Sequence, residues 1–109
     1  MNIIGVGIDI ADISRFEDKE SLAERVLSPD EFETYKARVD KASFLASRFA
    51  VKESYVKASQ DKMVDYRKLE VKKDDNGKPS LYLEGSLVKA FLSLSHDKEA
   101  IAIVILYKD

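Results

Sequence analysis

The longest regular pattern in the chain runs from roughly Lys41 to Ser59. Apolar residues recur there at spacings of three to four, the period of one helix face, and neither glycine nor proline interrupts them. They are Ala42, Leu45, Ala46, Phe49, Ala50, Val56 and Ala58. The pattern predicts one long helix, and the fold of a 109-residue chain has to be built around its apolar face.

A second helix is predicted to begin directly after Ser28. Ser28 is a typical N-cap residue, Pro29 suits the first helical position, and Glu31 can return a hydrogen bond to the cap. The helical pattern continues to about Arg38.

The other regular segments are predicted to be strands. The first, from Ile3 to Ile10, is β-branched and contains two glycines, which indicate that something approaches its backbone closely. The later strands are expected at Leu69–Lys73, Ser80–Leu83, Leu92–His96 and Ala100–Tyr107. An Asn-Gly pair within residues 74–79 predicts a hairpin turn, and residues 97–99 predict a bend.

This order, mainly helical and then mainly extended, predicts an α+β fold. We expect an antiparallel sheet with helices packed on it, forming a single domain over residues 1–109. Because a chain this short buries a modest fraction of its surface, we expect its site in a groove or between subunits.

Charge and cysteine content exclude several classes of protein. Eighteen basic and twenty acidic residues give a net charge of -2, which argues against a general nucleic-acid binder. The absence of cysteine excludes disulfides, thiolate metal sites and cysteine nucleophiles, and it fits a reducing compartment. The apolar start, Met1 to Ile10, is too short to span a bilayer. We therefore expect a soluble, cytoplasmic protein with no membrane partner.

Two acids stand in unusual surroundings. At about 100° per residue, Glu53 falls between Ala46 and Phe49 on the long helix, where a carboxylate is costly unless something positive satisfies it. An ordinary surface pair with Lys57, one turn on, would do so, and a functional role is the alternative. Asp9 ends the first strand, where it could be a solvated edge residue, a helix N-cap or a ligand.

Taken together, Asp9 and Glu53 suggest a magnesium site. Two carboxylates are too few for a calcium cage, but they suit Mg²⁺, which keeps several waters and takes its remaining ligands from substrate phosphates. Mn²⁺ suits the same oxygen ligands. The substrate implied by this interpretation is a diphosphate.

The only histidine, His96, follows Ser95 at the end of a strand. It could be an ordinary hydrogen-bonded turn histidine or part of a ligand pocket. The Asn76 to Pro79 segment is most often simply a turn.

Four segments, in order and across nearly the whole chain, resemble the holo-acyl-carrier-protein synthases, the small trimeric branch of the phosphopantetheinyl transferases. The segments are Gly5–Ile10 followed by Arg15, Ala23–Leu27 with the capped helix after it, Phe44–Ala58, and Asn76–Pro79 with Ser93–His96. The resemblance implies transfer of 4'-phosphopantetheine from coenzyme A to a serine of apo-acyl carrier protein in fatty acid biosynthesis, with 3',5'-ADP as the second product.

The resemblance also implies roles for individual residues. Asp9 and Glu53 would hold Mg²⁺ against the coenzyme diphosphate, with Lys57 beside the same phosphates, and these three would be the catalytic residues. We further hypothesise that Glu53 takes the serine proton through a water. The implied coenzyme-binding positions are Arg48, Lys57, Asn76, Gly77, Lys78, Pro79, Ser95 and His96.

Subunit assembly and carrier binding follow from the same resemblance. Arg48, Ser95 and His96 would line the coenzyme pocket, where their groups suit the 3'-phosphate. The 76–79 turn of a neighbouring subunit would lie near the adenine, in a homotrimer with its active sites at subunit interfaces. Arg15 and Arg25 would face the acidic helix of the carrier protein.

The chain departs from the family pattern after Ala58. Many relatives carry a glycine-rich stretch near the phosphates there, whereas residues 59–64 of this chain contain no glycine. Ser54 stands where alanine is usual. We therefore expect a different arrangement of phosphate contacts. Two other functions could use the same residues, namely a non-catalytic carrier-binding trimer and a magnesium-dependent phosphohydrolase.

Overall fold

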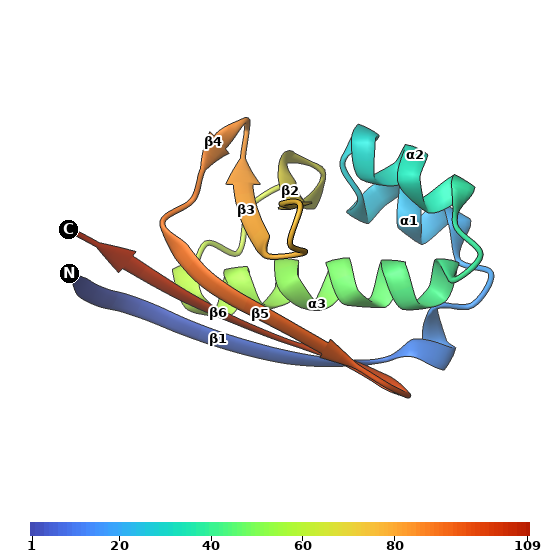
Figure 1. Cartoon of the computed structure of the whole chain (residues 1–109), viewed down its shortest axis with the longest axis horizontal. Helices are drawn as coiled ribbons and strands as arrows, with labels where there is room; N and C mark the ends of the chain where they lie inside the picture. The colour runs from blue at the N-terminus through green and yellow to red at the C-terminus, as the bar shows by residue number, and fades with distance from the viewer.

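Three α-helices and two antiparallel three-stranded sheets make up the fold in a computed structural model that describes residues 1–109 (Figure 1). The elements in chain order are β1 (Asn2–Asp12), the 3-10 helix η1 (Ile13–Phe16), α1 (Glu20–Val26), α2 (Pro29–Ala37), α3 (Lys41–Ser59), the 3-10 helix η2 (Tyr66–Lys68), β2 (Leu69–Lys73), β3 (Pro79–Leu83), β4 (Ser86–Leu87), β5 (Ala90–His96) and β6 (Glu99–Lys108). The α+β fold predicted from the sequence is therefore confirmed.

The larger sheet has the strand order β1-β6-β5, and the smaller one has the order β2-β3-β4. The first and last strands of the chain pair along their whole length, with Asn2 opposite Lys108 and Asp9 opposite Ala102, so the two termini lie side by side (Figure 1). The division of the strands between two sheets was not predicted from the sequence. In the view of Figure 1, α3 lies between the larger sheet and a layer that contains the smaller sheet, α1 and α2.

The two glycines of β1 allow α3 to lie directly on the strand. A Cβ atom on Gly7 would come within 1.9 Å of the Ser54 carbonyl oxygen, and one on Gly5 within 2.0 Å of the Ala58 carbonyl oxygen. No other residue type fits at such distances without moving the helix backbone. Because side chains alternate along a strand, the face that carries these glycines also carries Asp9.

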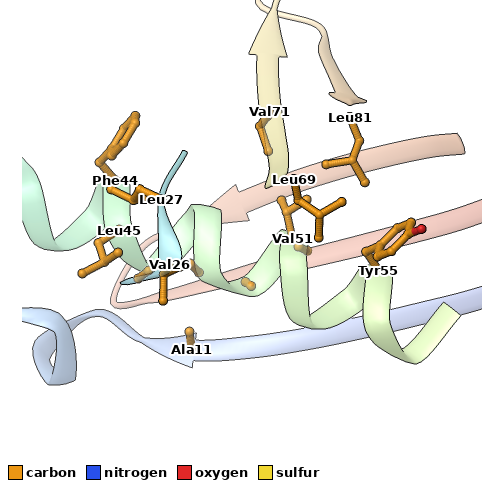
Figure 2. Packing of buried hydrophobic residues seen from close by; sticks show 14 of the residues in the cluster. Ala11, Val26, Leu27, Phe44, Leu45, Val51, Tyr55, Leu69, Val71 and Leu81 are labelled. Carbon is orange, nitrogen blue, oxygen red and sulfur yellow. The ribbon is translucent and has the colours of Figure 1, made fainter. Parts of the chain in front are cut away.

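The core lies mainly on the two sides of α3. Figure 2 shows Val51 and Tyr55 of α3 near Leu69 and Leu81 of the smaller sheet, and all four side chains are buried. On the opposite side, small buried residues of the larger sheet, such as Ala102, leave room for the helix. Burial on both sides explains why apolar residues cover so much of the circumference of α3.

A buried ion pair joins α3 to the layer that contains α1, α2 and the smaller sheet. Lys52 is fully buried, and its Nζ donates to Glu31 Oε1 at 2.6 Å, to the Val26 carbonyl at 2.8 Å and to the Tyr66 carbonyl at 2.9 Å. Glu31 also completes the capping box with Ser28 and accepts from the Val71 amide at 2.9 Å. One pair of side chains thus connects α1, α2, α3, η2 and β2.

Most predicted element bounds hold to within two residues. The long helix runs from Lys41 to Ser59 as expected, and the capping box at Ser28 is confirmed. Glu99, expected in a bend, is instead the first residue of β6. Four short elements, η1, α1, η2 and β4, were not predicted. None of the helices combines the length and the apolar character that crossing a membrane requires.

Replacing Lys52 with methionine should lower the free energy of unfolding by about 3–5 kcal/mol, because the Glu31 carboxylate would then be buried without its cation. Denaturant titration at a fixed chain concentration measures the change. The matched control is Lys36→Met, which removes a lysine from an exposed pair with Glu33 and should cost less than about 1 kcal/mol. Equal losses in the two variants would contradict the structural role of Lys52.

Candidate active site

Asp9 lies at the contact between β1 and α3, where Lys57 reaches it. The Lys57 Nζ donates to Asp9 Oδ1 at 3.2 Å and to the Ile8 carbonyl at 2.9 Å. The Asp9 side chain is 14% exposed, whereas that of Lys57 is 55% exposed. The ammonium group is therefore held at the strand while part of it still faces solvent.

Glu53 lies one helical turn before Lys57 and is half-buried. Its Oε2 accepts a hydrogen bond from the Tyr66 hydroxyl. The surface pair between Glu53 and Lys57, which the helix spacing left open, does not form, because the Lys57 ammonium bonds to β1 and no ion pair of the structure includes Glu53. The interpretation of Glu53 as an ordinary surface-pair residue is wrong.

Burial is the main electrostatic effect on Asp9 and on the Tyr66 hydroxyl. Burial raises the pKa of Asp9, the hydrogen bond and charge of Lys57 oppose this rise, and the charge of Glu53 adds to it. Burial and the bond to Glu53 also raise the pKa of the Tyr66 hydroxyl, which keeps it protonated as a donor. The two carboxylates act on each other and only Asp9 is paired with a lysine, an arrangement that a bound cation would stabilise.

The donor set fits Mg²⁺ only if a substrate shares the coordination. No group of three or more histidine, cysteine or acidic side chains in the chain could hold a metal ion by itself. Two carboxylates together with waters and phosphate oxygens satisfy the octahedral preference of Mg²⁺. Asp9 and Glu53 are therefore suited to a metal that arrives with a phosphate-bearing ligand.

A second cluster of chemically active side chains surrounds a hollow of about 260 Å³. Its charged and hydrogen-bonding lining residues are Arg38, Asp40, Ser43, Ser47, Arg48, Lys73 and His96. Asp40 is already bound by Arg38 at 2.7 and 2.8 Å. The remaining cationic and neutral donors make this hollow suited to an anion.

Arg48 has donor capacity that the chain itself does not use. Its guanidinium stacks over the Phe44 ring at 4.4 Å from the centroid, and its Nε is buried without a hydrogen-bond partner. Burial lowers the pKa of Arg48, with the charge of Glu31 opposing the shift. A buried unpaired donor beside a hollow indicates a missing acceptor.

The structure does not bring the two clusters together within one chain. Arg48 and Glu53 are five residues apart on α3, a rotation of about 140° around the helix axis at 3.6 residues per turn. The hollow lined by Arg48 and His96 contains neither Asp9 nor Glu53. The carboxylates and the cationic hollow therefore lie on different sides of α3.

The other predicted positions lie around these clusters. Ser95 and His96 share a second hollow with the bend between β5 and β6. Asn76, Gly77 and Lys78 are exposed in the β2–β3 turn, where Gly77 has a φ of 81°. The amides of Asn76 and Lys78 both donate to the Asp74 side chain at 2.9 Å, so the turn is ordered by its own contacts.

Arg15 and Arg25 are both exposed, on η1 and α1 respectively. The Arg25 Nε donates to the Ser21 carbonyl at 3.4 Å, so its terminal amino groups remain free for a partner. The segment between these two arginines also carries acidic residues, namely Glu17, Asp18, Glu20 and Glu24.

Three contributors to these clusters were missed in the sequence, namely Tyr66, Arg38 and Lys73. Tyr66 opens a three-residue 3-10 helix that has no periodic pattern. Arg38 caps the end of α2, and Lys73 is the last residue of β2. Local sequence patterns can identify helices and strands such as α2 and β2. They do not show which side chains at the ends of these elements the fold brings together.

The chain matches the family model of the 4'-phosphopantetheinyl transferase superfamily over residues 5–105. It is similar to the holo-[acyl-carrier-protein] synthase of Geotalea daltonii, with 39% identity that covers 97% of this chain and 99% of the relative. The corresponding protein of Trichlorobacter lovleyi is 41% identical, and the match covers 95% of this chain and 97% of the relative.

Solved structures show the same likeness. The holo-(acyl-carrier-protein) synthase of Bacillus anthracis, in complex with CoA (3',5'-ADP), superposes with a TM-score of 0.85 at 36% identity and with complete coverage of both chains. The holo-[acyl-carrier-protein] synthase of Thermotoga maritima gives a TM-score of 0.84 at 35% identity, covering 98% of this chain and 65% of that one.

Replacing Asp9 with asparagine should raise the melting temperature of the metal-free protein at pH 7. Because the pKa of Asp9 is raised in the folded chain, ionised Asp9 costs stability once the pH rises above its ordinary value. Asparagine has the same shape and avoids this cost, so the gain should amount to a few degrees and should shrink as the pH falls toward 4. Thermal unfolding in a chelator at pH 7 and pH 4 measures it. The exposed Asp75→Asn variant is the control, and a lower melting temperature for Asp9→Asn at pH 7 would contradict the prediction.

Proposed function

The chain belongs to the 4'-phosphopantetheinyl transferase superfamily, among its holo-[acyl-carrier-protein] synthases, and from this membership we propose how its two side-chain clusters share one reaction. The enzyme transfers phosphopantetheine from coenzyme A to acyl carrier protein, a step of fatty acid biosynthesis. The proposal rests mainly on the proximity of Asp9, Glu53 and Lys57 at the contact between β1 and α3. Lys57 bonds to Asp9, and the charge of Glu53 acts on Asp9. The proximity of two carboxylates and one exposed ammonium supports binding of a diphosphate together with its cation.

We propose that Asp9 and Glu53 hold Mg²⁺, or Mn²⁺, together with the coenzyme diphosphate. The bound ion would neutralise the diphosphate and polarise the phosphorus under attack. Lys57 adds its own positive charge, because its ammonium is fixed by the Ile8 carbonyl and by Asp9 while more than half of the side chain stays exposed. The ammonium can therefore stabilise the negative charge of the phosphates both in the bound substrate and in the transition state.

The transfer exchanges one phosphorus–oxygen bond for another. The carrier serine oxygen forms a bond to the phosphorus that bears pantetheine, and the bond from that phosphorus to 3',5'-ADP breaks. The serine proton needs a base, and we assign this role to Glu53, acting through a water. The Tyr66 hydroxyl occupies one oxygen of Glu53, which leaves the other available to the water or the metal.

The cationic hollow provides a second anchor for the coenzyme. Arg48 and His96 would bind the 3'-phosphate there, since both line the hollow and Arg48 has a buried donor without a hydrogen-bond partner. Ser95 would extend this site along β5, and the 76–79 turn would contact the adenine. Because Arg48 and Glu53 face different sides of α3, we propose that one coenzyme spans two subunits.

The outer face of the larger sheet supports assembly into a homotrimer. Ile4, Val6, Ile8 and Ile10 of β1 are 57%, 56%, 58% and 57% exposed, and they alternate with the residues that face α3. Phe91 of β5 and Ile101 of β6 continue this exposed apolar face across the sheet. An exposed apolar surface of this kind is typical of a protein interface.

Carrier recognition is assigned to the end of the molecule that contains η1 and α1. Arg15 and Arg25 are exposed there and would contact an acidic helix of the carrier, where charge complementarity mainly accelerates association. We place the protein in the cytoplasm, in line with its lack of cysteine.

Incubation with Mg²⁺, coenzyme A and an apo-acyl carrier protein should increase the carrier mass by one phosphopantetheine group, as measured by mass spectrometry. Asp9→Ala should slow the transfer by on the order of 100-fold or more, the scale for loss of a preorganised charge-stabilising group. Glu33→Ala, which removes an exposed acid of α2, is the control and should leave the rate unchanged. Loss of coenzyme A without carrier modification would instead indicate a phosphohydrolase, and an unchanged coenzyme and carrier would indicate a non-catalytic carrier-binding protein.

Light scattering after gel filtration should give about three times the chain mass of 12.3 kDa. A Val6→Glu substitution places a charge in the outer face of the larger sheet and should yield folded monomers that no longer transfer phosphopantetheine. Val39→Glu is the matched control, because Val39 is fully exposed on the loop between α2 and α3. Monomeric but fully active wild-type protein would refute the shared site.

A further inference from the structure

We propose that Tyr66 is a positioning residue that sets the Glu53 carboxylate for cation binding. The inference rests on the proposed function, in which Glu53 is a metal ligand. Its basis is the hydrogen bond from the Tyr66 hydroxyl to Glu53 Oε2. No other side chain bonds to the Glu53 carboxylate, because the nearest cation on the helix, Lys57, is engaged by Asp9 and the Ile8 carbonyl.

Glu53 needs such a partner more than Asp9 does. Asp9 has a short side chain on a strand that is pressed against α3, and it already bonds to Lys57. Glu53 has a longer, half-buried side chain with more rotamers to lose on binding a metal. A fixed phenol that selects one rotamer in advance removes part of that ordering cost from the binding step.

Tyr66 can select a rotamer because it is itself fixed from several sides. Its carbonyl oxygen accepts from the buried Lys52 ammonium at 2.9 Å. Its ring packs against Phe49 with the centroids 6.2 Å apart, and the Asp65 side chain caps the 3-10 helix by accepting from the Arg67 amide at 2.9 Å. The backbone of Tyr66 is therefore bonded to the same buried ion pair that joins the helices, and this contact fixes the base of the phenol side chain.

The short return after α3 explains how a residue that lies 13 positions after Glu53 comes back to it. The helix ends at Ser59, and its C-cap residue Gln60 adopts a left-handed conformation with a φ of 62°. The Asp61 side chain then accepts from the Met63 amide at 3.1 Å, which tightens the turn. The chain therefore returns directly after the helix that carries Glu53 and brings Tyr66 within hydrogen-bond reach of it.

The hydrogen bond also gives the two Glu53 oxygens different roles, because only one of them accepts from Tyr66. A phenol has a single hydrogen to donate, and it is directed at Oε2. Oε1 remains free of side-chain partners and can face the cation. Hydrogen bonds that orient metal-binding carboxylates in this way typically strengthen metal affinity by about 10- to 100-fold.

The test compares Tyr66→Phe, which deletes only the hydroxyl, with Tyr35→Phe, which deletes a hydroxyl on α2 that makes no hydrogen bond to the site. Mn²⁺ is titrated by electron paramagnetic resonance at saturating coenzyme A without carrier, so that no turnover takes place. Tyr66→Phe should weaken Mn²⁺ binding by about 10-fold or more, and Tyr35→Phe should not change it.

Turnover gives an independent readout. In Tyr66→Phe the Mg²⁺ concentration for half-maximal rate should rise by the same factor, and kcat should recover at high Mg²⁺. A rate that stays low at every Mg²⁺ concentration would overturn the positioning role, as would equal or tighter Mn²⁺ binding by the variant. If the wild-type protein modifies the carrier but binds no Mn²⁺, both the inference and the metal role of Asp9 and Glu53 fail, whereas the transferase function stands.

Discussion

The direct contact between α3 and β1 fixes the position of the whole candidate active site. Gly5 lies against Ala58 and Gly7 against Ser54, so the strand and the helix run in opposite directions with almost no side chains between them. Two residues further along the same strand face, the first side chain that meets the helix is a carboxylate, Asp9. The site therefore depends on the absence of side chains at two positions as much as on the charged groups themselves.

Lys52 and Lys57, two of the three lysines of α3, show how one helix can carry both a structural charge and a charge that stays open to a ligand. The Lys52 ammonium has three acceptors, one for each of its hydrogens, and it is fully buried, so it has no capacity left for a ligand. The Lys57 ammonium has two acceptors and is partly exposed, so one hydrogen remains for a phosphate. The two ammonium groups lie five residues apart on the helix and have the same chemistry. Only the Lys57 ammonium has a hydrogen without an acceptor, so only this group can take part in substrate binding.

Sequence patterns predicted the elements well where the signal is local. The capping box at Ser28 and the apolar period of α3 each depend on neighbours within a few residues, and both are found as predicted. The helix α1 was missed because it has seven residues and no side-chain cap at Lys19. Partners within the site were harder still. The spacing rule paired Glu53 with Lys57, but the fold brings in Tyr66 from an irregular segment, and no periodicity records that contact.

The first strand also explains why a site in so small a chain is proposed to need a second copy. Apart from Asp9, its residues from Ile3 to Ala11 are apolar or glycine on both faces, the pattern of a strand that is covered on both sides. Within one chain α3 covers only the face with the glycines, and the isoleucines on the other face stay exposed. A partner that packs on that outer face would hold the same strand whose Ile8 carbonyl binds Lys57 and whose inner face presents Asp9. Assembly would thus stabilise the catalytic geometry and, by the same contact, bring the neighbour's cationic hollow within reach of the coenzyme.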